Sequence, residues 1–177
     1  GNWKYITIAL PGRKLLARIW RVDVGRVPLY LLDTDMEQNT AADKQITYQL
    51  YGGDWENRFK QELLLGVGGI RLLDELKINA SLFHSNEGHA AFIGIERLRK
   101  LVNDEKLSFA QAIEVVKSTT AFTTHTPVPA GHDTFDENIL RTYIPHYAER
   151  LNMSWDEFMN LGKVIPNNPN EKFSMSI

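Results

Sequence analysis

After residue 76 the sequence alternates between short apolar stretches and longer amphipathic ones, a pattern that few folds produce. It predicts a buried strand over residues 80–84, a helix over 86–103, a second helix over 108–118 and another strand over 121–125. Strands that alternate with helices indicate an α/β fold, with a parallel sheet flanked by helices. Such sheets bind ligands at the carboxyl ends of their strands. The segments that follow the two strands should therefore lie close together at one edge.

Two short stretches rich in histidine fall at that edge. Four of the five histidines lie in HSNEGH, residues 84–89, and in HTPVPAGHD, residues 125–133. HSNEGH lacks the HExxH spacing that places two zinc ligands on one face of a helix. The sequence also has no Gly-x-Ser-x-Gly stretch to support a serine nucleophile. These observations argue against a metal centre and against a serine triad.

Polar recognition is the functional interpretation that remains. Asn86, Glu87 and His89 would lie at a helix N-terminus, where exposed amide groups suit hydroxyls or an anionic group. His125 would end the next strand. The alternative is purely structural, with Asn86 as the helix cap and His89 as a satisfied histidine of the core. The residues alone leave both interpretations open.

Other patterns predict the rest of the fold. Apolar residues separated by turn signals predict an N-terminal region of three antiparallel strands, at residues 4–10, 14–22 and 27–32. The third strand is apolar almost throughout, which predicts burial on both faces. Apolar spacing of three and four predicts a long helix over 54–76, in which GVGG permits close packing and does not form a phosphate loop. Two further helices are predicted over 135–151 and 154–161, followed by a polar connector over 163–172.

Composition limits the classes of function. The chain has 177 residues and a formal net charge of −2, so we expect no nucleic-acid partner. It has no cysteine and no apolar run of about 18 residues, so disulfides are excluded and we expect no membrane partner. We expect a cytoplasmic protein. The sequence begins within a strand-like pattern and stops at the start of an apolar segment, so we expect it to be a piece of a longer chain.

Five segments in a fixed order resemble one family of enzymes. They are VPLYLLDTD, ITYQLYGGDWENRFKQELLLGVGGIRLL, HSNEGHAAFIGIERLR, LSFAQAIEVVKSTTAFTTHTPVPAGHDTF and FSM. This series resembles the α-glucan (glycogen and maltodextrin) phosphorylases, especially the bacterial branch with NEGH and HTPVPAGHD. The resemblance covers about residues 20–177. Single motifs of this kind are moderately specific, whereas five in order are highly specific.

The resemblance implies a fold and an activity. Residues 2–177 would form one domain truncated at both ends, a partial Rossmann-like N-terminal domain of the GT-B type. The full-length enzyme would release glucose 1-phosphate from an α-1,4-glucan with inorganic phosphate. Pyridoxal phosphate would be its cofactor, held by a lysine outside this chain, so no residue here is expected to bind cofactor or metal. The chain alone would be inactive, and the resemblance leaves open whether the full-length enzyme is a homo-oligomer.

The resemblance also assigns site residues. His125 would be catalytic, with its main-chain carbonyl and its ring in contact with the sugar at the cleavage subsite. Asn86, Glu87 and His89 would line the pocket beside that sugar. The animal and plant branch has aspartate and threonine where this chain has Glu87 and Gly88, and it lacks the AGHD continuation. Substrate binding by two further residues therefore rests on the bacterial branch alone; these are His132 and Asp133.

Two other functions are compatible with these residues. One is a nucleotide-sugar glucosyltransferase, similar to glycogen synthase, which shares the two-domain architecture. The other is a glucan-binding module without chemistry. A module must bind glycogen by itself, whereas half of an active site should bind sugar only weakly because most contacts are missing.

Overall fold

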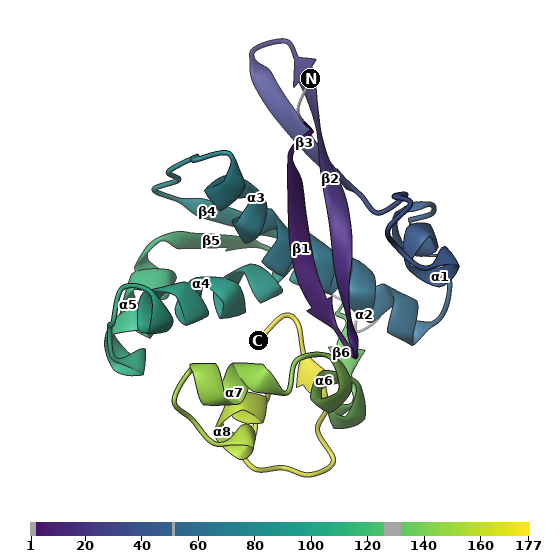
Figure 1. Cartoon of the computed structure of the whole chain (residues 1–177). Helices are drawn as coiled ribbons and strands as arrows, with labels where there is room; N and C mark the ends of the chain where they lie inside the picture. The colour runs from purple at the N-terminus through teal and green to yellow at the C-terminus, as the bar shows by residue number, and fades with distance from the viewer. Residues whose placement is uncertain (1–2, 51, 126–131) are drawn as a thin grey trace. The chain divides into compact units, whose positions relative to one another are not determined.

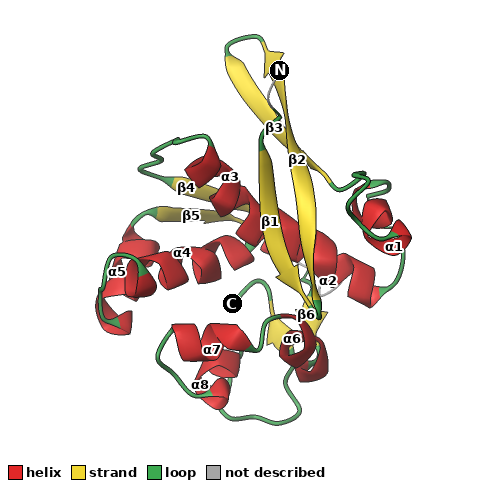
Figure 2. Ribbon diagram, viewed as in Figure 1, coloured by secondary structure: helices red, strands yellow, loops and turns green. Residues whose placement is uncertain are grey.

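The computed structural model describes residues 3–50, 52–125 and 132–177 and divides into two compact units, Gly1–Asn79 and Ala80–Ile177 (Figure 1). The first unit contains a three-stranded antiparallel sheet, and the second contains a parallel pair of strands with helices beside it (Figure 2). The predicted α/β class is confirmed. The assignment of residues 2–177 to one domain stays a prediction.

The sheet of the first unit has the order β1-β2-β3. Its strands are β1 (Tyr5–Leu10), β2 (Arg13–Val24) and β3 (Val27–Asp33), so the three predicted strands are confirmed. Both turns contain a glycine in the left-handed region, with φ of 69° at Gly12 and 61° at Gly25. Glycine reaches this region without strain because it has no Cβ. The turn signals in the sequence therefore locate both hairpins.

The prediction that the third strand is buried on both faces is wrong. Val27, Leu29 and Leu31 are 59%, 48% and 46% exposed in the described chain. They pair with Val24, Val22 and Trp20 of β2, which are also exposed. The physical reason is that β2 and β3 continue past Arg18, the last residue of β2 that pairs with β1, and antiparallel sheets can leave a face uncovered. A run of apolar residues shows that a strand is hydrophobic, but it does not show which neighbouring element covers the strand.

A long helical run follows, after the short helices α1 (Ala41–Lys44) and η1 (Gln45–Thr47). It consists of α2 (Trp55–Leu63), the π-helical segment η2 (Leu64–Gly68) and α3 (Gly69–Glu75), which confirms the helix predicted over 54–76. Asp54 caps it by accepting a hydrogen bond from the Asn57 amide. A Cβ on Gly68 would lie 3.1 Å from side-chain atoms of Ile6 and Leu32, so this glycine permits close packing against the sheet. At Gly69 a Cβ would meet nothing within 4 Å, so the packing interpretation fails there.

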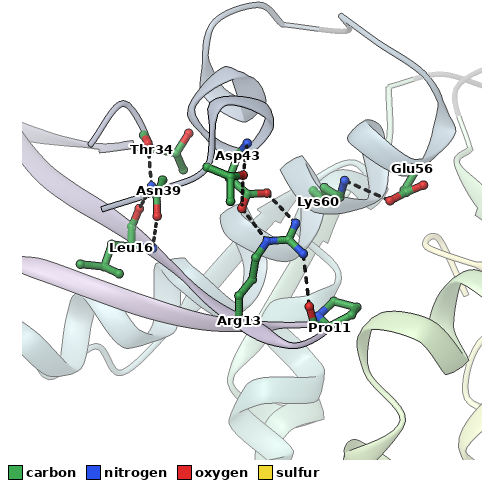
Figure 3. A network of polar contacts seen from close by, with 9 residues as sticks. Pro11, Arg13, Leu16, Thr34, Asn39, Asp43, Glu56 and Lys60 are labelled. Carbon is green, nitrogen blue, oxygen red and sulfur yellow. Dashed lines mark hydrogen bonds and ion pairs between the residues drawn. The ribbon is translucent and has the colours of Figure 1, made fainter. Parts of the chain in front are cut away.

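A half-buried ion pair ties the first hairpin to α1 (Figure 3). Arg13 donates from Nε and Nη2 to the two carboxylate oxygens of Asp43, at 2.6 and 2.7 Å. The Asp43 side chain is only 2% exposed, and Thr40 Oγ1 donates to it as well. Beside this pair, Asn39 bonds the main chain of Leu16 through both its oxygen and its nitrogen. These contacts fix the segment between β3 and α2, in which α1 and η1 are four and three residues long.

The parallel pair of the second unit matches the prediction. Its strands are β4 (Phe83–Asn86) and β5 (Thr120–Thr123), with Phe83 opposite Thr120 and Asn86 opposite Thr123. The connection contains η3 (Gly88–Ala90), α4 (Phe92–Asn103) and α5 (Phe109–Ser118). The side chain of Arg97 in α4 lies 3.9 Å from the Phe83 ring and bonds Thr120 Oγ1. Helix α4 is thereby fastened to the amino ends of both strands.

The remainder of the second unit departs from prediction at one helix. The single helix predicted over 135–151 is instead α6 (Glu137–Tyr143) and α7 (His146–Arg150). Pro145 separates them because proline has no amide hydrogen to continue a helix. Helix α8 (Trp155–Asn160) is confirmed, and a two-stranded ladder pairs β6 (Thr134–Phe135) with β7 (Phe173–Ser174). No helix in the described parts of the chain is long and apolar enough to cross a bilayer.

Candidate functional site

The two histidine-rich stretches meet at the carboxyl edge of the parallel pair, as predicted. Residues Asn86 and Thr123 are partners in the ladder, and His125 lies two residues past β5. The ring nitrogen Nε2 of His125 is 2.8 Å from Oδ1 of Asn86, although the two residues are 39 positions apart. The parallel arrangement is the cause, because it brings both strand ends to the same side.

This contact determines the tautomer of His125. The Asn86 oxygen can only accept a hydrogen bond, so Nε2 must carry the hydrogen. In a neutral ring, the other nitrogen, Nδ1, is then an acceptor. No described residue bonds Nδ1, and the side chain of His125 is exposed. The edge therefore presents an imidazole acceptor that suits a hydroxyl donor.

Glu87 is buried directly beneath this edge, at 6% exposure. Its carboxylate accepts a hydrogen bond from the backbone amide of His125 and another from Thr124 Oγ1, at 3.3 Å for the latter. Its own amide donates to the Thr123 carbonyl at 2.8 Å. The backbone of Glu87 has φ of 61° and ψ of −177°, a region that is almost restricted to glycine. Three hydrogen bonds within a few residues thus hold a strained backbone beside His125.

The C-terminal residues close the other side of the same segment. A Cβ on Gly88 would lie 3.0 Å from Met175 Cβ and from Ser176 Oγ, so only glycine fits without displacement. Ser176 Oγ is also 2.9 Å from Nδ1 of His132. The carbonyl of Asp133 accepts from the Met175 amide at 3.0 Å. The structure therefore brings His132 and Asp133 to the segment that carries Glu87, through Met175 and Ser176, which follow β7.

The helix predicted to start at Asn86 begins later. Asn86 ends a strand, and α4 starts at Phe92, so the interpretation of Asn86 as a helix cap is wrong. The reason is that Asn86 continues the ladder with β5, and its side chain bonds His125 instead of the helix amides. His89 lies half-buried on η3, and its role in substrate binding stays a prediction. Among the residues that the structure describes, no three acidic or histidine side chains form a group that could hold a metal ion.

Arg97 is a buried cation of the second unit that serves the fold and not this edge. Arg97 is buried under the opposite ends of the two strands, where it bonds the hydroxyls of Thr119 and Thr120. Burial lowers the pKa of its guanidinium below the ordinary value. At the edge itself, the side chains near His125 are an amide, hydroxyls and the occupied carboxylate of Glu87. This set favours neutral polyhydroxylated ligands over anions.

Several residues that shape the edge could not be recognised from the sequence. Thr123 and Thr124 contact His84 and Glu87, and their position at a strand end was the only signal available. Met175 and Ser176 at the C-terminal end of the unit contact Gly88 near its start, and no local sequence pattern links them. Residues 126–131 of the predicted HTPVPAGHD stretch lie outside the described residues.

Comparison with known proteins identifies the family. The carbohydrate phosphorylase family model matches residues 70–177, which contain this whole edge. The chain belongs to the carbohydrate phosphorylase family. It is 49% identical over 150 residues to a glycogen phosphorylase of Mycobacterium tuberculosis, across 81% of this chain and 17% of that protein. It is 46% identical over 158 residues to a maltodextrin phosphorylase of Thermococcus litoralis, across 89% of this chain and 19% of that protein.

A more distant phosphorylase aligns along the full chain. A glycogen phosphorylase of Aquifex aeolicus is 32% identical over 177 residues, which is 100% of this chain and 25% of that protein. The family membership expected from the five ordered motifs is confirmed. The chain spans between 17% and 25% of the length of these curated phosphorylases.

Proposed function

We propose that this chain is part of an α-glucan phosphorylase that uses inorganic phosphate to release glucose 1-phosphate from the end of an α-1,4-glucan. One observation carries the proposal. In a member of the carbohydrate phosphorylase family, the parallel edge holds His125 against Asn86 through Nε2, which leaves Nδ1 of a neutral ring as a hydrogen-bond acceptor. The described side chains around it are polar groups that can form hydrogen bonds, which suits the hydroxyls of a sugar. The finer fold assignment, a Rossmann-like sheet of the GT-B type, belongs to the same proposal.

His125 has two roles in this proposal. Its ring accepts a sugar hydroxyl through Nδ1, because Nε2 is engaged by Asn86. Its main-chain carbonyl faces the anomeric carbon and stabilises the positive charge that develops there as the glycosidic bond breaks. The ring orients the sugar and transfers no proton. Asn86, His89, His132 and Asp133 line the sugar pocket around it.

We assign the cofactor of the full-length enzyme to a site other than this carboxyl edge. Pyridoxal phosphate forms a Schiff base with a lysine, and a phosphate group needs basic partners. The described residues at the carboxyl edge offer imidazole, amide, hydroxyl and carboxylate groups but no lysine or arginine. This edge does not fit as the cofactor site, so we assign the cofactor to residues outside this chain. A cytoplasmic location stays a prediction.

The test is kinetic and uses the full-length enzyme. His125→Ala keeps the main-chain carbonyl but loses the ring contact, which is one hydrogen bond between neutral groups. Its net contribution is about 0.5–1.5 kcal/mol, rising to about 3 kcal/mol if a sugar hydroxyl is left buried and unpaired. Because about 1.4 kcal/mol is tenfold in rate, kcat/KM for phosphorolysis should fall between twofold and a few hundredfold. Lys117→Ala, at an exposed position on α5, is the matched control and should have wild-type activity.

Several outcomes would contradict the proposal. A loss in the millionfold range would make the imidazole an essential acid or base, and no loss in a folded variant would remove the ring from the site. Glucosyl transfer from a nucleotide sugar, without any release of glucose 1-phosphate, would instead identify a glucosyltransferase. We also expect the 177-residue chain alone to be inactive. Release of glucose 1-phosphate from glycogen by this chain, with phosphate and pyridoxal phosphate added, would therefore contradict the proposal.

A further inference from the structure

We propose that Glu87 is a positioning residue, which holds the main chain of His125 in place and does not itself contact the sugar. This inference rests on the proposed function and assigns a different role to Glu87 from the substrate contact that resemblance implies. The observation behind it is a buried carboxylate that accepts hydrogen bonds from the His125 amide and the Thr124 hydroxyl.

The chemistry of these contacts suits a carboxylate. Both groups directed at Glu87 are donors, and an ionised carboxylate offers two oxygens that only accept. Hydrogen bonds to an ionised acceptor are about twice as strong as those between neutral groups. With 6% of Glu87 exposed and both oxygens occupied, little of the side chain is left for a ligand. Glu87 therefore acts through His125.

Two consecutive residues hold His125 at two points. Glu87 binds its backbone amide, and Asn86 binds its ring nitrogen Nε2. Fixing the amide and the far side of the ring also fixes the Cα and the side-chain rotamer between them. The ring nitrogen Nδ1, which is the acceptor in the proposed site, then has one position. A catalytic group held to a fraction of an ångström loses much of its effect when displaced.

The backbone at Glu87 indicates that a glycine would be the easier choice at this position. Its φ of 61° and ψ of −177° lie where a non-glycine residue is strained. Such strain persists only where the surroundings hold it, and it is concentrated at functional sites. A glycine would relieve the strain, but it would leave the His125 amide and the Thr124 hydroxyl without their acceptor. The presence of a carboxylate at this strained position therefore needs a reason, and its hydrogen bonds to His125 and Thr124 supply one.

The experiment compares three substitutions: Glu87→Ala, Glu87→Gly and Glu87→Gln. Alanine and glycine both remove the carboxylate, but only glycine relieves the backbone strain, so Glu87→Gly should be the more stable of the two in urea denaturation. Glutamine keeps an oxygen for the His125 amide and an N–H for the Thr124 hydroxyl. Stability and positioning are thereby varied separately.

Amide hydrogen exchange of the 177-residue chain reads out the positioning directly. Losing a hydrogen bond to a charged group should lower the protection of the His125 amide by about tenfold to a hundredfold in the alanine and glycine variants. Glutamine should keep protection within about threefold of wild type. The Phe83 amide, which donates to the Thr119 carbonyl at 2.9 Å at the other end of the strand pair, is the internal control and should not change.

Kinetics of the full-length enzyme link positioning to reaction. Glu87→Ala and Glu87→Gly should both lose about tenfold to a hundredfold in kcat/KM, mostly in kcat, despite their different stabilities. Glu87→Gln should recover most of the activity. Unchanged protection of the His125 amide in both truncated variants would overturn the inference, as would lost protection with undiminished phosphorolysis. If the wild-type enzyme shows no phosphorolysis, the proposed function fails, while the exchange experiment still decides the contact between Glu87 and His125.

Discussion

Replacing Asp43 by asparagine tests whether the half-buried ion pair in Figure 3 stabilises the first unit. Asparagine has the same shape but only one oxygen. In either orientation its NH₂ group faces an Arg13 donor, Nε or Nη2, that the carboxylate had accepted. At least one charge-assisted hydrogen bond is lost, worth about 1.5–3 kcal/mol. Because the Arg13 side chain is 36% exposed, water compensates part of this, and we expect a loss of about 2 kcal/mol.

The assay is urea denaturation of the 177-residue chain in a Trp155→Phe background. The remaining tryptophans all lie in the first unit, so their fluorescence reports on it alone. The urea midpoint should fall with an unchanged m-value. The matched control is Asp23→Asn, because Asp23 also pairs with an arginine, Arg21, but both side chains are about 60% exposed. This exposed pair should contribute no more than about 0.5 kcal/mol.

The pH dependence gives an independent check on the same pair. The hydrogen bonds and charge of Arg13 hold the pKa of Asp43 below its ordinary value of 3.8. Stability from a lowered carboxyl pKa is complete above the unfolded value and is lost as pH falls through the folded value. The difference between wild type and Asp43→Asn should therefore be constant from pH 7 to about pH 5 and shrink below pH 3.8. A cost equal to that of Asp23→Asn at pH 7, or a difference that fades between pH 7 and pH 5, would refute the reasoning.

Three further predictions concern packing and capping. Gly68→Ala should destabilise the first unit by about 1–2 kcal/mol, because the added methyl lies 3.1 Å from side chains on the sheet. Gly69→Ala should be neutral or stabilising by up to about 1 kcal/mol, because its Cβ meets nothing within 4 Å and alanine favours the helix. Equal urea midpoints for the two variants would contradict the close contact at Gly68. Ser108→Ala should cost about 1 kcal/mol by removing the capping box with Gln111, and thermal denaturation should show no comparable loss for Ser118→Ala at the other end of the helix.

Features that depend on a few neighbouring residues were predictable from the sequence. Ser108 with Gln111, and Ser154 with Glu157, have the spacing of a capping box, and both boxes form. The alternation of strands and helices predicted a parallel pair, and with it the meeting of Asn86 and His125. This long-range contact was accessible because the direction of parallel strands fixes where their ends lie. Pro145 was also a local signal for the end of a helix, because proline lacks an amide hydrogen. The prediction of one helix across it did not take this into account.

The tertiary structure decided burial and the use of each polar group. Apolar residues of β3 are exposed because they lie where the β2–β3 pairing extends past the pairing of β2 with β1, which depends on strand register and not on the residues themselves. Glu87 is part of the same NEGH motif as Asn86, yet its carboxylate is turned to the backbone of a residue 38 positions later. A Cβ on Gly88 would fit only if Met175 or Ser176 shifted, because both pack on it. Local sequence patterns indicate periodicity and helix caps. Which surfaces pack together depends on segments that are far apart in the sequence, so the roles of these residues can be assigned only from the folded chain.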